Sequence, residues 1–163
     1  MNNLKTELLQ LLSENARYTV SELAVMLGAN EDDIKSAISE MERDGVIVKY
    51  TTIVNTEALE NKKVQALIEV KVAPQQLKGF DSCAEEIYNF PEVTSLYLMS
   101  GGFDLAVFIE GKDITEIARF VAEKLSVLEG IIGVQTHFIL KKYKIEGHIT
   151  KPSEEIKRQI IGA

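Results

Sequence analysis

The chain has 163 residues, of which 45% are hydrophobic and 26% are charged, as is typical of a globular protein with one ordinary domain or two small ones. Its formal net charge of −7 argues against a generic polyanion binder, because phosphate contacts require lysine and arginine. No apolar run of membrane-spanning length and no amino-terminal signal segment is visible in the sequence, so we expect a cytoplasmic protein without a membrane partner.

Apolar residues at helical spacing predict three helices in the first part of the chain, over residues 4–15, 19–28 and 30–45. Thr19 or Ser21 is expected to cap the second helix, which ends at Gly28. Asn30 is expected to cap the third helix, and the acidic run 31–33 suits the positive end of its dipole.

The β-branched run 46–55 predicts the strands of a β ribbon after the third helix. Three helices followed by a ribbon are the order of a winged helix-turn-helix. We therefore expect a DNA-binding domain over residues 1–54, followed by a polar linker over residues 55–63.

The second part of the chain predicts the order β-α-β-β-α-β. We expect strands over residues 64–74, 91–100, 104–111 and 133–147, and helices over residues 80–90 and 113–130. This order is that of a ferredoxin-like sandwich, so the fold class is α+β, with a second domain over residues 64–150. A tail over residues 151–163 is expected to carry a short helix after Pro152.

Several motifs in this order resemble those of one family of regulators. Residues 41–47 and Tyr50 follow the pattern Leu-Glu-x-x-Gly-hydrophobic-Ile with a later Tyr, and SGGFD at residues 100–104 follows Ser/Thr-Gly-x-Tyr/Phe-Asp. With SELAVMLG at residues 21–28 and LEGIIGVQTHFILK at residues 128–141, they resemble the Lrp/AsnC family of feast/famine transcription regulators along nearly the whole chain.

The resemblance implies a winged helix-turn-helix joined to a RAM-type effector domain, in a protein that binds double-stranded DNA. It also implies homodimers that pair their carboxy-terminal sheets face to face and assemble into tetramers or octamers. A small effector, usually an amino acid, would bind in the second domain and alter assembly or DNA affinity. The expected effector contacts are Leu98, Met99, Ser100, Gly101, Gly102, Phe103, Asp104, Thr136 and Phe138.

Spacing alone leaves two interpretations of Gly101-Gly102 open. The pair is a favoured two-residue hairpin connection, because primed turns need positive φ. Alternatively, the glycine amides hold a carboxylate and Asp104 holds an ammonium, which are the two ends of a free amino acid. Strand alternation places Thr136 and Phe138 on one face of the last strand and His137 on the other, and the family resemblance favours the effector site.

The third helix departs from the family, whose members carry several arginines there. The chain has Ala37, Ser39 and Glu40 at three of those positions, and residues 1–58 carry five cations against ten acids, a net charge of −5. A regulator that reads DNA remains one interpretation, and an amino-acid-sensing oligomer with a degenerate, non-DNA-binding winged helix is the alternative. The expected DNA contacts are Ser21, Lys35, Ser36, Ser39, Arg43, Lys49 and Tyr50.

The sequence offers little for catalysis. Some relatives with this two-domain plan decarboxylate tetrapyrroles, a chemistry that requires histidine and arginine, and this chain has two histidines, His137 and His148, and few arginines. Cys83 is the single cysteine and falls at a helical core position. We therefore expect no enzyme, no catalytic residues, no metal and no cofactor.

Overall fold

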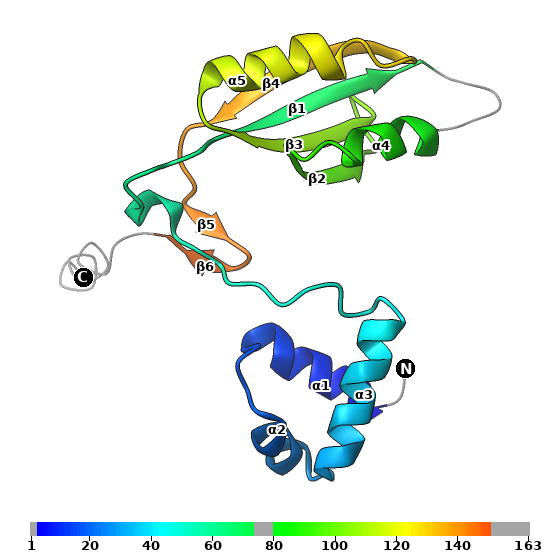
Figure 1. The fold of residues 1–163 in the computed structure, drawn as a ribbon, viewed down its shortest axis with the longest axis vertical. Helices are drawn as coiled ribbons and strands as arrows, with labels where there is room; N and C mark the ends of the chain where they lie inside the picture. The colour runs from blue at the N-terminus through cyan, green and yellow to red at the C-terminus, as the bar shows by residue number, and fades with distance from the viewer. Residues whose placement is uncertain (1–2, 74–79, 151–163) are drawn as a thin grey trace. The chain divides into compact units, whose positions relative to one another are not determined.

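The computed structural model describes residues 3–73 and 80–150 (Figure 1). The chain divides after Val54 into two compact units. We describe each unit by itself. Within the described ranges, no helix is long and apolar enough to cross a membrane.

Three helices form the first unit: α1 (Asn3–Glu14), α2 (Val20–Leu27) and α3 (Glu31–Arg43). Helices this short are marginal alone and depend on burying one apolar face. Leu8 of α1, Leu23 of α2, and Ile34 and Met41 of α3 are almost completely buried against one another. The three predicted helices are confirmed, and their shared core fixes which face of α3 points outward.

The ends of α2 show how local chemistry sets the helix boundaries. Thr19 is the N-cap: its hydroxyl accepts from the Glu22 amide at 3.2 Å, and the Glu22 carboxylate accepts from the Thr19 amide at 2.7 Å. This reciprocal pair is a capping box. Gly28 ends the helix in the left-handed region at φ 60°, a conformation that glycine adopts without steric cost.

Two local predictions in this unit are wrong. Asn30 stands at the N-cap position of α3, but its side chain makes no capping hydrogen bond and instead lies 3.3 Å from the Asp33 carboxylate. The expected β ribbon over residues 46–55 is absent, and Val48 is 89% exposed. A strand needs a hydrogen-bonded partner, and the described residues of this unit contain no other strand for it to pair with.

The second unit contains a four-stranded antiparallel sheet in the order β2-β3-β1-β4. A single 3₁₀ turn, η1 (Thr56–Ala58), precedes the sheet in the expected linker. The elements in chain order are β1 (Val64–Val72), α4 (Asp81–Tyr88), β2 (Val93–Leu98), β3 (Leu105–Gly111), α5 (Ile114–Phe120) with the π-helical turn η2 (Val121–Leu125), and β4 (Ile131–Ile139). This topology confirms the predicted ferredoxin-like α+β class.

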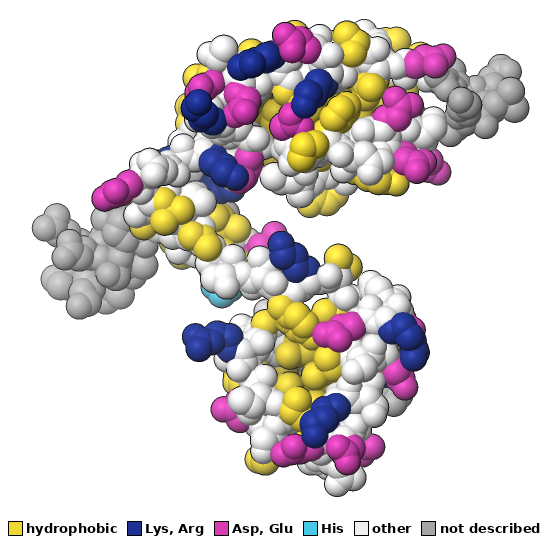
Figure 2. Space-filling view, in the orientation of Figure 1, with side chains coloured by type: hydrophobic (Ala, Val, Ile, Leu, Met, Phe, Trp, Pro, Cys, Tyr) yellow, Lys and Arg dark blue, Asp and Glu magenta, His cyan; other side chains and the backbone are white. Residues whose placement is uncertain are grey.

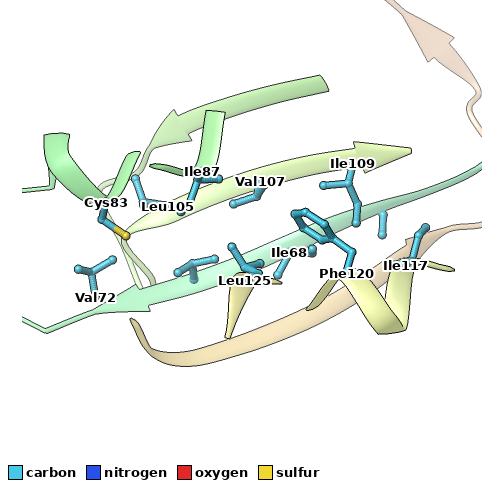
Figure 3. Packing of buried hydrophobic residues seen from close by; sticks show 12 residues of the cluster. Ile68, Val72, Cys83, Ile87, Leu105, Val107, Ile109, Ile117, Phe120 and Leu125 are labelled. Atoms are coloured by element: carbon cyan, nitrogen blue, oxygen red, sulfur yellow. The ribbon is translucent and has the colours of Figure 1, made fainter. Parts of the chain in front are cut away.

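Both helices of this unit cover the same face of the sheet (Figure 3). Alternate residues of β1, among them Ile68, are buried beneath Ile87 of α4 and beneath Ile117 and Phe120 of α5. Because side chains alternate along a strand, the residues between them point to the other face, which neither helix covers. The chain therefore has one helix-covered face and one open face in this sheet.

The second unit differs from expectation at two helix and strand ends. Asp113 caps α5 as predicted, accepting from the Glu116 amide at 2.8 Å, but the helical run ends at Leu125 rather than Gly130. After β4 the chain makes a small hairpin of β5 (Lys144–Ile145) and β6 (His148–Ile149), where one continuous strand was expected. The expected end of the first strand at Pro74 and the helix after Pro152 lie outside the described residues.

The capping box gives a stability prediction. Thr19→Ala removes the hydroxyl that accepts from the Glu22 amide, and we expect the first unit to lose about 1 kcal/mol of unfolding free energy. Urea denaturation followed by circular dichroism measures the change. Ser21→Ala on the exposed first turn of the same helix is the matched control, and an equal loss in both variants would contradict the capping role of Thr19.

Candidate DNA-binding and ligand-binding sites

Four of the predicted DNA contacts form one exposed stripe on α3. Lys35, Ser39 and Arg43 follow one another at intervals of four residues, with Ser36 beside them, and all four are exposed. A helix turns by about 100° per residue, so these side chains lie opposite the buried Ile34 and Met41. The structure thus brings these four residues together on the exposed face of α3.

Acidic side chains occupy the same stripe (Figure 2). The Lys35 ammonium lies 3.6 Å from the Glu31 carboxylate and 3.5 Å from that of Asp32, while the Arg43 guanidinium donates to Asp44 at 3.1 Å. Exposed pairs of this kind contribute little to stability. They do reduce the positive charge that Lys35 and Arg43 can offer to phosphate.

Two further acids of α3 also have hydrogen-bond partners. Lys5 of α1 donates to Glu40 at 2.6 Å, and this hydrogen bond, with the charge of Lys5, lowers the pKa of the Glu40 carboxyl. The Tyr50 hydroxyl donates to Glu42 at 3.0 Å, and burial, followed by the Glu42 contact, raises the pKa of Tyr50. Tyr50 therefore packs back toward the end of α3 instead of standing apart from it.

The remaining positions follow from the core. Ser21 is exposed on α2 and Lys49 is exposed after α3, so both are accessible. Ala37 is buried in the helical core at 6% exposure, although the family pattern places a basic residue there. A match to the family pattern by position along the chain does not show which face of the helix a residue occupies, so it gives no sign that Ala37 is buried.

The loop between β2 and β3 spans six residues, Met99–Asp104. It is closed by the Met99 amide, which donates to the Asp104 carbonyl at 2.8 Å. Gly101 and Gly102 lie within this loop, and neither has positive φ. The predicted two-residue primed hairpin is therefore wrong, since such a turn requires positive φ at its centre.

Asp104 ties this loop to the end of β1. Its backbone amide donates to the Val70 carbonyl at 2.9 Å, and its Oδ2 accepts from the Val72 amide at 2.8 Å. Asp104 is half-buried, and its Oδ1 accepts no hydrogen bond from the residues that the structure describes. One carboxylate oxygen thus holds the loop in place, and the other is available to a donor from outside.

The two loop glycines have no steric reason to be glycine within this chain. A Cβ added at Gly101 or at Gly102 would meet no atom of the described residues within 4 Å. Gly111 shows the contrast, because a Cβ there would lie 2.9 Å from Ile117. Since neither backbone conformation nor crowding requires them, the loop glycines leave an exposed backbone that a ligand can approach closely.

The structure splits the predicted effector contacts into two groups. Leu98 and the loop are contiguous, whereas Thr136 and Phe138 pair along β4 with Ile68 and Ala66 of β1. Both point to the helix-covered face, where Phe138 packs against the core. Within one chain they are therefore not brought to the loop.

His137 takes the opposite face, as strand alternation predicts. It lies on the open face of the sheet, and its Nε2 is 3.2 Å from Glu69 Oε1.

A hollow of about 380 Å³ lies between α4 and β2 and extends to Leu98 and Leu105, the residues on either side of the loop Met99–Asp104. Among the described residues, no group of three or more histidines, cysteines and acids could hold a metal ion.

Two family models match the chain, one in each unit. A model of winged helix-turn-helix DNA-binding domains matches residues 1–48, and a model of the Lrp/AsnC ligand binding domain matches residues 65–149. YugG of Bacillus subtilis, an uncharacterized HTH-type transcriptional regulator by name, is 40% identical over 96% of this chain and 95% of its own.

Solved structures share the whole fold. An AsnC family transcriptional regulator from Agrobacterium tumefaciens has 25% identity and a TM-score of 0.69, covering 96% of this chain and 99% of its own. The regulator NMB0573 of Neisseria meningitidis, solved as a complex with L-Met, has 23% identity and a TM-score of 0.68 over 96% of this chain and 99% of its own.

A helix-turn-helix unit and a ligand-binding domain on one chain define a DNA-binding regulator that carries its own small-molecule receptor. The chain belongs to the Lrp/AsnC family of HTH-type transcriptional regulators. The family is one of transcription regulators and not of enzymes, which agrees with the expectation from the sequence.

Substitutions at Asp104 separate its structural contact from its charge. Asp104→Ala leaves the Val72 amide without its partner, and we expect a loss of about 1–3 kcal/mol in unfolding free energy. Asp104→Asn keeps an oxygen that can accept from this amide, so most of the stability should remain. Thermal and urea unfolding measure both variants, and equal stability of the alanine variant and the unchanged protein would refute the anchoring role.

Proposed function

We propose that this regulator binds specific DNA sequences and that an amino acid, bound at the loop Met99–Asp104, modulates its assembly or DNA affinity. One observation carries the effector proposal: Gly101 and Gly102 expose backbone that no contact with the described part of the chain requires to be glycine. Beside them Asp104 is fixed in position, with one oxygen engaged in the fold and one available.

This arrangement suits a zwitterion. Exposed backbone amides can donate to a carboxylate, and an aspartate within reach can accept from an ammonium group. The complex of the Neisseria regulator with L-Met supports an amino acid over other small anions. We take residues 98–104 as the proposed contacts and leave out Thr136 and Phe138, because they lie beneath the helices.

We further propose that copies of the chain pair through the open face of the sheet. Leu67 of β1 and Phe108 of β3 are neighbours in the sheet register and point away from the helices. Their apolar side chains are only partly buried in the single chain, and Tyr97 stacks edge-on against Phe108 at 6.0 Å between ring centroids. A second copy would remove this surface from water.

Assembly also bears on DNA binding. Each helix-turn-helix unit, called a head below, offers few cations for phosphate, because Lys35 and Arg43 are paired with acids. Several weak heads held in one assembly bind with a high effective concentration, so the assembly can bind DNA when a single head binds poorly. An effector that changes the assembly would then change DNA affinity without contacting the DNA.

The ion pairs that Lys35 and Arg43 each form with neighbouring acids favour a second candidate function. An assembly that senses an amino acid, with a helix-turn-helix that no longer reads DNA, would share the ligand loop but need no phosphate contacts. The two candidates differ only in whether the heads bind DNA, so the DNA measurement below distinguishes them.

The effector proposal is tested by a thermal-shift screen of the twenty amino acids, read together with the oligomer mass from light scattering. We expect at least one amino acid to raise the unfolding temperature and to change the mass. Asp104→Asn should abolish this shift, because it removes the negative charge that holds the ammonium, while Glu123→Gln, an exposed acid on η2, should not. Stabilisation that persists in Asp104→Asn would place the amino acid elsewhere.

The DNA proposal is tested by anisotropy titration of the protein's own upstream DNA at several salt concentrations. The double variant Glu31→Gln/Asp32→Asn releases Lys35 and removes two repelling charges, so we expect binding about two- to tenfold tighter at low salt. Glu7→Gln/Glu14→Gln on α1 makes the same change in charge away from the stripe and is the control. If neither the unchanged protein nor the released variant binds any duplex, the sensor candidate replaces the DNA reader.

A further inference from the structure

The sheet carries a group of lysines at the end opposite to the effector loop. Lys62 and Lys63 precede β1, and Lys141 and Lys142 follow β4. Because β1 and β4 are antiparallel with Gln65 opposite Ile139, the start of one strand lies beside the end of the other (Figure 1). Two pairs of lysines that are far apart in the sequence therefore lie at the same end of the sheet.

These four lysines line a single hollow of about 300 Å³. Apolar side chains form much of the remaining wall, and none of the lining residues that the structure describes is an aspartate or a glutamate. The other lining residues are Thr56, Val64, Gln65, Ile114, Phe138, Ile139 and Leu140. A volume of this size is at the lower end of the range for small-molecule sites.

Two of these lysines have described neighbours, an acid in one case and an aromatic ring in the other. Lys63 lies 3.4 Å from Glu110, and the Lys141 ammonium lies 5.2 Å from the centre of the Tyr143 ring. Like charges at one site repel one another, and a bound anion converts this repulsion into attraction. In a chain of net charge −7, four lysines that line one hollow are a local concentration of cationic side chains.

The apolar wall indicates what kind of anion fits. Leu140 is 93% exposed and Ile114 is 57% exposed, so both present apolar surface to solvent at the lysine cluster. A bare inorganic anion would use only the ammonium groups. An anion with an attached organic group would use both, gaining charge-assisted hydrogen bonds and burying apolar surface.

We propose that this hollow binds a small organic polyanion of the organic phosphate class. The site lies at the opposite end of β1 from the Asp104 loop, so the chain would have two separate ligand inputs. The proposal goes beyond the amino-acid effector and does not rest on it, because it uses none of the loop residues.

The experiment uses ATP in EDTA as the probe, with isothermal titration calorimetry on the full chain. We expect ATP to bind, inorganic triphosphate to bind more weakly, and adenosine not to bind. Lys141→Gln/Lys142→Gln should weaken ATP binding at least about tenfold, because two charge-assisted contacts are lost. Lys71→Gln/Arg119→Gln removes the same charge from exposed positions outside the hollow and should leave ATP binding unchanged.

Three results would overturn the proposal. They are no ATP binding at low salt, equal weakening of ATP binding by both double variants, and triphosphate binding as tight as ATP binding, which would leave only a nonspecific polyanion contact. Anisotropy with duplex DNA adds a fourth: if the lysine variant loses DNA affinity while ATP binding is unchanged, the lysines belong to a DNA contact. Lys62→Gln/Lys63→Gln repeats the test from the β1 side if the first variant fails to fold.

Discussion

The pairing of β1 with β3 on one side and with β4 on the other is the constraint on which the second unit depends. This central strand buries alternate side chains beneath α4 and α5. Near its end, the Val70 carbonyl accepts a hydrogen bond from the Asp104 amide, and the Val72 amide donates one to the Asp104 carboxylate. Its first residue, Val64, follows the two lysines that meet those after β4. One strand therefore sets both proposed ligand positions and keeps them at opposite ends.

In the first unit, the buried core determines the orientation of α3, and the surface charge determines how strongly its exposed face attracts phosphate. Leu8, Ile34 and Met41 hold α3 so that Lys35 and Arg43 face outward. The acids beside these cations then limit how strongly the exposed face attracts phosphate. The weak DNA binding that these charges predict is compatible with the fold if several copies act together, as proposed above.

Elements that bury a periodic apolar face could be predicted from the sequence. Helices α1–α5 and strands β1–β4 could be predicted because residues such as Ile34 and Ile68 recur at the spacing of the element that buries them. The ribbon over residues 46–55 was not predictable in this way, because β-branched residues indicate a preference and not a partner. The hairpin of β5 and β6 was missed because its strands have only two residues each, too few to show a period.

The candidate sites also differ in whether they depend on local spacing or on partners far along the chain. The exposure of Lys35 and Ser39 followed from helical spacing, since the opposite face had to be buried. The carboxylate of Asp104 could not be assigned from the sequence, because the Val72 amide that it accepts from is 32 residues away. The lysine hollow depends on pairing between strands from the two ends of the domain, and spacing within either segment gives no sign of it.

The contact between Asp104 and Val72 also allows the opening of the loop Met99–Asp104 to be measured by hydrogen exchange. In most of the sheet a backbone N–H is protected from deuterium exchange by a carbonyl on the neighbouring strand. The Val72 amide is held instead by a side chain from the β2–β3 loop, so it exchanges whenever that loop lifts away. This single amide is an internal probe of loop opening that requires no label, and its protection factor reports the free energy that holds the loop Met99–Asp104 in place.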